Sequence, residues 1–182
     1  MEYEIRLARP DELDRLVEVT ESGRQYLRAQ GVPQWQNGSG PGRKEIETDI
    51  ERARGYVLEV AGAVSGYASL IAGPEGSPLL IEGAWTGPCE CYTTIHRVAL
   101  DSSVRGGGFA GEFLGRVIQI AKDLGYPDIR IDTHPQNIIM QKVIGKAGFL
   151  EVGVLELPIL NGKRLAYQLL VDPTQGEATW QS

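Results

Sequence analysis

Residues 98–111 read Val-Ala-Leu-Asp-Ser-Ser-Val-Arg-Gly-Gly-Gly-Phe-Ala-Gly, and this stretch decides the fold. An apolar, β-prone run ends near Leu100, a short polar loop follows, and three glycines, Gly106 to Gly108, open an amphipathic helix. Glycine lacks a Cβ atom, so ligand oxygens can approach its backbone closely. The first turn of a helix carries unpaired N–H groups, and the helix dipole favours negative charge there. A strand, a glycine loop and a helix N-terminus in this order therefore predict an anion site, most often for phosphate.

The segments on either side of the loop predict a strand–helix–strand unit. Residues Gly108 to Leu124 place six apolar side chains on one helical face: Phe109, Phe113, Val117, Ile120, Ala121 and Leu124. Before the loop, Cys91 to Leu100 is typical of a central strand, and after the helix Asp128 to Thr133 alternates apolar and charged residues. Two such strands joined by a helix are expected to be parallel, with a right-handed crossover.

The rest of the chain adds strands that we expect to pair in the antiparallel sense. Strands are predicted at Tyr3–Ala8, Tyr56–Val60, Val64–Ile71, Phe149–Leu160 and Arg164–Val171, and helices at Arg9–Gly31, Arg43–Arg54 and Asn137–Ala147. Residues 79–85 are ambiguous. The predicted fold class is a mixed α/β fold, with a mostly antiparallel central sheet, one parallel β-α-β crossover and helices on both faces. We expect a single domain over residues 1–182, with its core at 91–150 and a frayed tail at 173–182.

The composition argues against several classes of protein. The 182 residues carry a formal net charge of −6, which disfavours nucleic acid as a partner, because that affinity comes mainly from Lys and Arg. No apolar run approaches the roughly 20 residues of a membrane span, and the first residues lack the apolar segment of a signal peptide. We therefore expect a cytoplasmic protein that binds no membrane. The two cysteines, Cys89 and Cys91, and the two histidines are too few to predict a metal site.

The glycine loop has three interpretations. A plain linker would not open the clearest amphipathic helix of the chain. Gly106, Gly108 and Gly111 fit the Gly-x-Gly-x-x-Gly pattern of dinucleotide-binding folds, and Asp132 lies about where a ribose-binding acid is expected. That pattern follows its strand directly, however, whereas residues 101–105 intervene here, and repeated βαβ units are missing. The third interpretation takes Arg105-x-x-Gly108-x-Ala110 as the functional unit.

This last unit resembles the acyl-coenzyme A pyrophosphate loop of the GNAT superfamily of N-acetyltransferases. The next strand ends in Asp132-Thr133-His134-Pro135-x-Asn137, and Gly148-Phe149 follows eleven residues after Asn137, which is similar to the second GNAT signature. Two motifs at this separation are more specific than either alone. The close resemblance covers about residues 95–150, and the order of elements extends it more loosely to the whole chain. It implies a GNAT-like fold and acetyl-CoA (coenzyme A) as the cofactor.

The resemblance also implies which residues bind the cofactor. The backbone N–H groups of Arg105 to Ala110 would hold the pyrophosphate, and the Arg105 side chain is either a charged donor to it or a solvated loop charge. The backbone of Val98 and Leu100 would pair with the pantetheine arm. Asn137 would bind the same arm, serve as a helix N-cap, or do both. The full set of candidates is Val98, Ala99, Leu100, Arg105, Gly106, Gly107, Gly108, Phe109, Ala110, Gly111 and Asn137.

Transfer to an amine calls for a base, because a lysine-like amine has a pKa near 10.4 and only about one molecule in 10³ is neutral at pH 7. His96 is the candidate general base. It precedes Val98 and Leu100 by two and four residues, so strict alternation predicts that the three side chains share one face. Some amine acetyltransferases of the superfamily carry a histidine nine residues before the motif arginine, as here. A histidine of the core is the competing interpretation, and His134, Glu82, Glu90 or water are alternative bases.

The general acid of the superfamily is missing from its usual place. A tyrosine often follows the asparagine by seven residues, and this chain has Ile144 there. Tyr92, Tyr126 or water would have to protonate the departing thiolate. A free thiol has a pKa of about 8.5, so a thiolate is already a fair leaving group.

The resemblance predicts an N-acetyltransferase that moves the acetyl group of acetyl-CoA to a primary amine by direct attack in a ternary complex. The acceptor is expected to be a small molecule or a peptide, with Trp35, Trp85 and His134 as tentative acceptor-site residues. A non-catalytic acyl-CoA-binding sensor is the alternative, and a toxin that acetylates charged tRNA is disfavoured by the net charge. The sequence leaves open whether the protein forms a homodimer.

Overall fold

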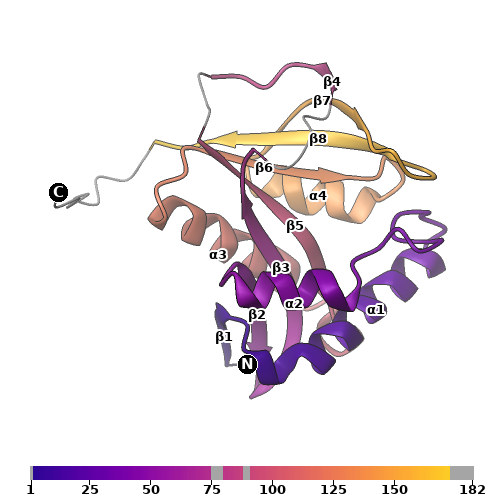
Figure 1. The fold of residues 1–182 in the computed structure, drawn as a ribbon, viewed down its shortest axis with the longest axis vertical. Helices are drawn as coiled ribbons and strands as arrows, with labels where there is room; N and C mark the ends of the chain where they lie inside the picture. Colours follow the sequence, from indigo (N-terminus) through magenta and orange to yellow (C-terminus); the bar gives the residue numbers. More distant parts are fainter. Residues whose placement is uncertain (1, 75–79, 88–90, 173–182) are drawn as a thin grey trace, which may run out of the picture.

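The computed structural model describes residues 2–74, 80–87 and 91–172, and within these ranges eight strands form one sheet (Figure 1). In spatial order the strands are β1 (Tyr3–Leu7), β2 (Gly55–Val60), β3 (Ala63–Ala72), β5 (Tyr92–Leu100), β6 (Asp128–Thr133), β8 (Lys163–Leu170), β7 (Leu150–Glu156) and β4 (Ile81–Gly83). All neighbours are antiparallel except β5 and β6, which are parallel. The predicted mixed sheet with one parallel pair is confirmed.

Helices cover both faces of this sheet, as predicted (Figure 1). A short 3-10 helix (Pro10–Glu12) leads into α1 (Leu13–Ala29), which packs together with α2 (Arg43–Glu51) over one face. On the other face, α3 (Phe109–Asp123) and α4 (Ile138–Lys146) enclose the larger core. The first core is built on Leu16, Val19, Ile46, Val57, Tyr67 and Ala99, and the second includes Phe113, Val117, Ile129 and Ile144. Apolar residues at helical spacing therefore face the sheet from each side.

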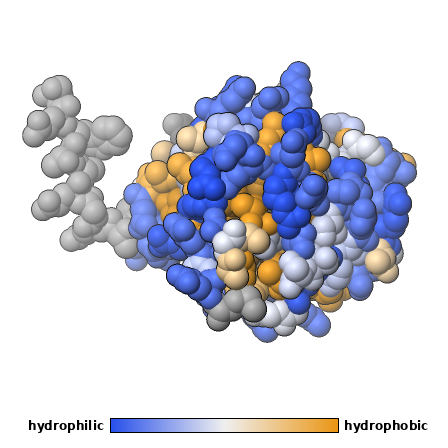
Figure 2. Space-filling view, turned by 90° about the horizontal axis from the view of Figure 1, so that it is seen from below, coloured by the Kyte–Doolittle hydropathy of each residue, from blue (hydrophilic) through white to orange (hydrophobic). Residues whose placement is uncertain are grey.

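Local differences from the predicted elements are small. The ambiguous segment 79–85 contains the short strand β4, which pairs with β7 at the edge of the sheet. The tail at 173–182, Cys89 and Glu90 lie outside the described residues. Among the described residues no helix is both long and apolar enough to cross a membrane. Hydrophilic side chains cover most of the face seen in Figure 2, with apolar residues exposed between them.

Strands β5 and β6 separate after a short ladder, and this separation positions the site. They pair from Tyr92 with Asp128 to Ile95 with Ile131 and no further, whereas β3 stays paired with β5 as far as Leu100. In Figure 1 β5 then runs diagonally across the molecule while β6 stays nearly horizontal. The edge of β5 that faces β6 is consequently open from His96 onward. An open strand edge offers N–H and C=O groups to an extended ligand.

A β-bulge lies at the start of this open edge. Ser69 of β3 pairs with His96 and Tyr67 pairs with Ala99, so β5 has one residue more than β3 between these pairs. Arg97 has a φ of 59°, which is unusual for a residue other than glycine. The predicted shared face for His96, Val98 and Leu100 was wrong, because the extra residue shifts the alternation. His96 lies on the Tyr67 and Ala99 face, beneath α1 and α2, whereas Val98 and Leu100 pack against the core of α3 and α4.

Candidate active site

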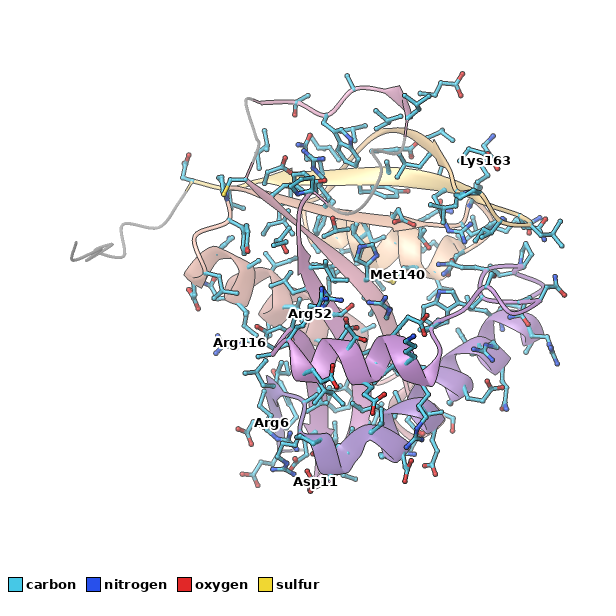
Figure 3. The ribbon with its side chains drawn as sticks, viewed as in Figure 1. Arg6, Asp11, Arg52, Arg116, Met140 and Lys163 are labelled. Atoms are coloured by element: carbon cyan, nitrogen blue, oxygen red, sulfur yellow. The ribbon has the colours of Figure 1, made fainter. Side chains whose placement is uncertain are left out.

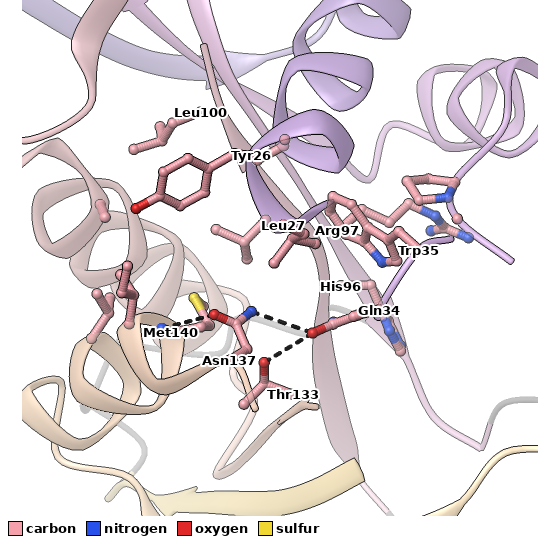
Figure 4. Close-up of a pocket in the computed structure, with 18 of the residues that line it drawn as sticks. Tyr26, Leu27, Gln34, Trp35, His96, Arg97, Leu100, Thr133, Asn137 and Met140 are labelled. Atoms are coloured by element: carbon pink, nitrogen blue, oxygen red, sulfur yellow. Dashed lines mark hydrogen bonds between the residues drawn. The ribbon is translucent and has the colours of Figure 1, made fainter. Parts of the chain in front are cut away.

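A pocket of about 620 Å³ occupies the space where β5 and β6 separate (Figure 4). Its walls come from the second half of α1, the α1–α2 loop, residues 95–100 of β5, the glycine loop, α4 and the β7–β8 hairpin. Met140 of α4, which lines it, lies in the middle of the view in Figure 3, while Arg6, Asp11 and Lys163 lie toward the edges of the molecule. A concave site of this size suits a small molecule or a cofactor.

The glycine loop forms one end of the pocket. Gly106 and Gly108 have φ values of 80° and 84°, and Gly108 is the N-cap of α3. A Cβ atom added at Gly106, Gly108 or Gly111 would meet no other atom within 4 Å, so the space beside these backbones is open. Gly106 and Gly108 line the pocket, whereas Gly107 and Gly111 do not. Left-handed glycines at the start of a long helix are the geometry that an anion site at this loop requires.

The Arg105 side chain lines the pocket and is also engaged within the protein. Its guanidinium donates to the Leu100 carbonyl at 2.7 and 3.1 Å and to Ser22 Oγ at 2.8 Å, and it lies 4.6 Å from the centre of the Tyr26 ring. Burial lowers the pKa of Arg105 from its ordinary value. The guanidinium therefore joins the end of β5 to α1.

Asn137 caps α4 and contacts the α1–α2 loop. Its Oδ1 accepts from the Met140 N–H at 3.2 Å, which confirms the N-cap role, and its Nδ2 donates to Gln34 Oε1 at 3.3 Å (Figure 4). The same Gln34 oxygen accepts from Thr133 Oγ1 at 3.3 Å and from the His134 N–H at 3.1 Å. Gln34 thus connects the loop before α2 to the end of β6. Nothing in the sequence marked this residue, since Gln34 is an ordinary polar residue of a loop.

The comparisons with known proteins agree with this geometry. Residues 24–149 match the model of the Acetyltransferase (GNAT) family, which is more than half of the chain. The chain belongs to the GNAT acetyltransferase family. A GNAT acetyltransferase from Streptococcus agalactiae is 34% identical, with a TM-score of 0.83 over 93% of this chain and 96% of that one. A search of the curated proteins finds no match.

More distant structures share the fold. A GNAT acetyltransferase from Listeria monocytogenes is 20% identical, with a TM-score of 0.74 over 94% of this chain and 96% of that one. The protein yncA from Salmonella typhimurium, whose structure contains its cofactor acetyl-CoA, is 19% identical. Its TM-score is 0.66, and the match covers 93% of this chain and 94% of that one. Of the GNAT cofactor candidates named above, Val98, Ala99, Leu100, Arg105, Gly106, Gly108, Phe109, Ala110 and Asn137 line the pocket.

His96 lies at the other end of this GNAT pocket. It lines the wall together with Trp35 of the α1–α2 loop, and its neighbour Ile95 marks the last pair between β5 and β6. Because the bulge turns His96 toward α1 and α2, its imidazole faces away from the core of α3 and α4. The pocket therefore runs from the glycine loop, along the open edge of β5, to a histidine and a tryptophan.

The bulge is held by a buried carboxylate that sequence reasoning missed. Asp49 of α2 is fully buried and accepts from Tyr67 Oη at 2.8 Å, Arg54 Nε at 2.8 Å and Arg97 Nη1 at 2.9 Å. Burial, with the charge of Asp49, raises the pKa of Tyr67, so this hydroxyl stays protonated and donates. A signal was present in the sequence: Asp49 lies three residues after Ile46 and so falls on the apolar face of the predicted helix.

Two residues tentatively assigned to the acceptor site do not line the pocket. His134 is buried, and its Nδ1 accepts from the Gln136 N–H at 3.1 Å. Burial and the charge of Arg164 lower the pKa of His134. Trp85 lies outside the pocket, with the Arg130 guanidinium 4.2 Å from its ring centre. Both side chains are thus engaged elsewhere.

The alternative acids and bases are also placed by the structure. The centre of the Tyr92 ring lies 3.6 Å from the Arg130 guanidinium, and Tyr92 does not line the pocket. Glu82 is exposed on β4, far along the sheet from β5. Ile144, at the usual position of the family's tyrosine, is fully buried in the core of α3 and α4. A tyrosine that does line the pocket is Tyr26 of α1, which the sequence did not single out.

Proposed function

We propose that this GNAT protein uses acetyl-CoA to acetylate the nitrogen of a primary amine, with both substrates bound at once. The observation that supports it most is the continuity of one pocket from the glycine loop to His96 and Trp35. A site with two ends can hold a cofactor in one and an acceptor in the other, which brings the reacting atoms together without a covalent enzyme intermediate.

The residues present fit acetyl-CoA. The backbone of Gly106 and Gly108 and the first turn of α3 would hold the pyrophosphate, and the open edge of β5 at Val98 would bind the pantetheine arm as an added strand. When bound, acetyl-CoA would supply an activated thioester. Overall, the thioester C–S bond breaks and an N–C bond forms; an acceptor that enters as the ammonium ion loses two protons, of which one ends on the CoA thiolate and the other in solvent. Asn137 already donates to an oxygen of Gln34 and can donate in the same way to an amide carbonyl.

His96 is the base of the proposal. An alkylamine enters mostly as the ammonium ion, because its pKa is near 10.4. A neutral imidazole accepts that proton directly or through one water molecule, and a histidine is suited to this task near neutral pH. The bulge supports the role, since it turns His96 toward the side of the pocket that α1 and α2 cover.

Direct transfer is supported by the state of the hydroxyl groups in the pocket, because none of those described below is activated as a nucleophile. Ser39 and Thr133 line it, but their hydroxyls donate to the Gln36 carbonyl at 2.8 Å and to Gln34 Oε1 at 3.3 Å. Neither donates to a base that would make it a nucleophile. Cys91, the cysteine within the described residues, does not line the pocket. Protonation of the leaving thiolate falls to water, because Ile144 is buried where a tyrosine would otherwise donate.

The test is release of free thiol from acetyl-CoA over a panel of primary amines, with His96→Ala beside the wild type. We expect kcat to fall by about 10²- to 10⁴-fold, the usual contribution of a general base, while the Kd of CoA stays within about twofold. His134→Asn is the matched control, because His134 is the other histidine of the chain and does not line the pocket. Unchanged turnover in His96→Ala between pH 6 and 9 would exclude His96 as the base. Tight CoA binding with no turnover on any amine would favour the acyl-CoA sensor instead.

A further inference from the structure

Two arginines outside the cofactor loop line the pocket. Arg97 comes from the bulge of β5, and Arg164 comes from the start of β8, where the β7–β8 hairpin returns to the sheet. The two side chains are 21% and 4% exposed, so their charges are largely removed from water. Such charges are costly unless they have partners, and their remaining N–H groups are therefore informative.

Arg97 uses one of its terminal nitrogens within the protein. Nη1 donates to Asp49 Oδ2 at 2.9 Å and to Ser69 Oγ at 3.0 Å. Among the described residues, nothing accepts from its Nε or Nη2. The residue lines the pocket, and neither nitrogen is a fully buried atom without a partner. A guanidinium has five N–H groups in a fixed plane, so this side chain keeps donors for a ligand.

Arg164 likewise uses some of its N–H groups within the protein and keeps others for a ligand. Its Nη1 donates to the carbonyls of Asn161 and Lys163, both at 2.8 Å, and its Nε lies 3.6 Å from Asp132 Oδ1. Within the described part of the chain no acceptor is found for Nη2. Burial lowers the pKa of Arg164, which reflects the cost of keeping this charge away from water. An anion in the pocket would offset that cost.

The charges around the two arginines also bear on the ligand. Asp49 is shared by Arg97 and Arg54, so this group carries one excess positive charge. Arg164 is accompanied by Asp132 and Glu156, and the carboxylates of Asp132 and Glu45 line the same pocket. The unshared positive charge of this end therefore lies at Arg97. An acceptor with several ammonium groups, such as a polyamine, would bring further positive charge toward two guanidinium groups. An acceptor with an ammonium and an oxyanion matches both signs.

We propose that the acceptor is an amine that also carries a carboxylate or a comparable oxyanion, and that Arg97 and Arg164 bind this oxyanion. The inference rests on the proposed function, because it names the substrate class of the same pocket. Arg is suited to the role, since its planar N–H groups match two oxygens of one carboxylate. The amine would then reach His96, which lines the same wall as Arg97.

The first arm of the experiment measures binding and needs no turnover. Isothermal titration calorimetry on the CoA-saturated protein uses N-acetyl derivatives of α-, β- and γ-amino acids, each paired with its carboxamide. Each pair has nearly the same shape and differs by the negative charge. We expect at least one acid to bind about tenfold or more tightly than its amide, as for a hydrogen bond to a charged group. Equal affinities within every pair would overturn the proposal.

The variants separate recognition from damage to the fold. Arg97→Gln and Arg164→Gln should each reduce the acid-to-amide ratio to within about threefold, while Arg97→Lys should keep part of it. Arg54→Gln is the matched control for Arg97, because Arg54 also donates to Asp49 at 2.8 Å but does not line the pocket. Its ratio should match that of the wild type. An equal loss in Arg54→Gln and Arg97→Gln would overturn the assignment of Arg97.

The second arm measures thiol release with the corresponding free amines, their carboxamides and spermidine. Acids should give the highest kcat/KM, and spermidine or the amides as the best acceptors would overturn the inference. Failure of the proposed function looks different: no amine releases thiol, while the N-acetyl acids still bind more tightly than their amides. The binding arm therefore decides the inference even if the protein does not catalyse the transfer.

Discussion

Replacing Gly108 by Ala should weaken CoA binding by more than its effect on stability explains. Gly108 has a φ of 84° at the N-cap of α3, and a Cβ there would point into open space beside the pocket. The left-handed backbone alone costs a residue with a Cβ about 1–2 kcal/mol. The new methyl group would also keep phosphate oxygens from the N–H groups of the first turn. Losing one or two such contacts costs roughly 1–2 kcal/mol, which raises the Kd of CoA about 5- to 30-fold.

Gly125→Ala is a control with almost the same backbone. Gly125 has a φ of 85°, nothing within 4 Å of an added Cβ, and a place just after the other end of α3, away from the pocket. Both variants should lower Tm by about 2–4 °C per kcal/mol of strain. Calorimetric titration with CoA separates them, because the Kd should rise in Gly108→Ala alone. A Kd for Gly108→Ala within twofold of the wild type would refute the placement of the pyrophosphate at this loop.

Three further predictions concern the groups around the pocket. Asp49→Asn should lower the free energy of unfolding in urea by about 3–5 kcal/mol, because it leaves two arginines without their buried counter-charge. The control Glu47→Gln, on the exposed side of α2, should change it by no more than about 0.5 kcal/mol. Ile144→Tyr should cost about 1–3 kcal/mol by overpacking and leave kcat no higher; a stable variant with faster turnover would contradict this. The pKa of His134 is lowered in the folded protein, so just below pH 6.5 the unfolded chain binds more protons than the folded chain. The free energy of unfolding should therefore fall as the pH drops below 6.5, by up to about 1.4 kcal/mol per pH unit from this group. His134→Asn, whose side chain can still accept from the N–H two residues on, should flatten that slope in urea unfolding followed from pH 7 to pH 5.

Local patterns explain why so much of the fold was predictable. The six apolar residues on one face predicted a helix at Gly108–Leu124, and α3 spans Phe109–Asp123. The alternation of Asp128–Thr133 gave the bounds of β6 without error. The glycine run also predicted where α3 begins, since Gly108 is its N-cap with a left-handed backbone. These features depend on neighbours within one or two turns of chain, which is the information that a sequence carries directly.

Side-chain partners were less predictable, because they come from distant segments. Arg105 was expected to be either a donor to phosphate or a solvated loop charge, and neither alternative named the partners it has, the Leu100 carbonyl and Ser22, which lies 83 residues away. Trp85 was expected in the acceptor site, but it meets Arg130. Gln34 and Asn137 are 103 residues apart in the chain and in contact in the fold. Long polar and aromatic side chains have many possible partners, and only the packed structure selects among them.

The bulge at His96 and Arg97 shows how one unpredicted residue changes the meaning of the others. Strict alternation would have put His96 on the face of Val98 and Leu100, against the core of α3 and α4. The extra residue moves it to the opposite face. The conformational free energy of the positive φ at Arg97 is offset by the hydrogen bond that its guanidinium donates to Asp49 of α2. One irregularity thus turns the proposed base toward α1 and α2, and it includes the arginine that lines the pocket beside that base. Because a bulge without glycine or asparagine leaves no mark in the sequence, the acceptor half of this site could be argued only from the fold.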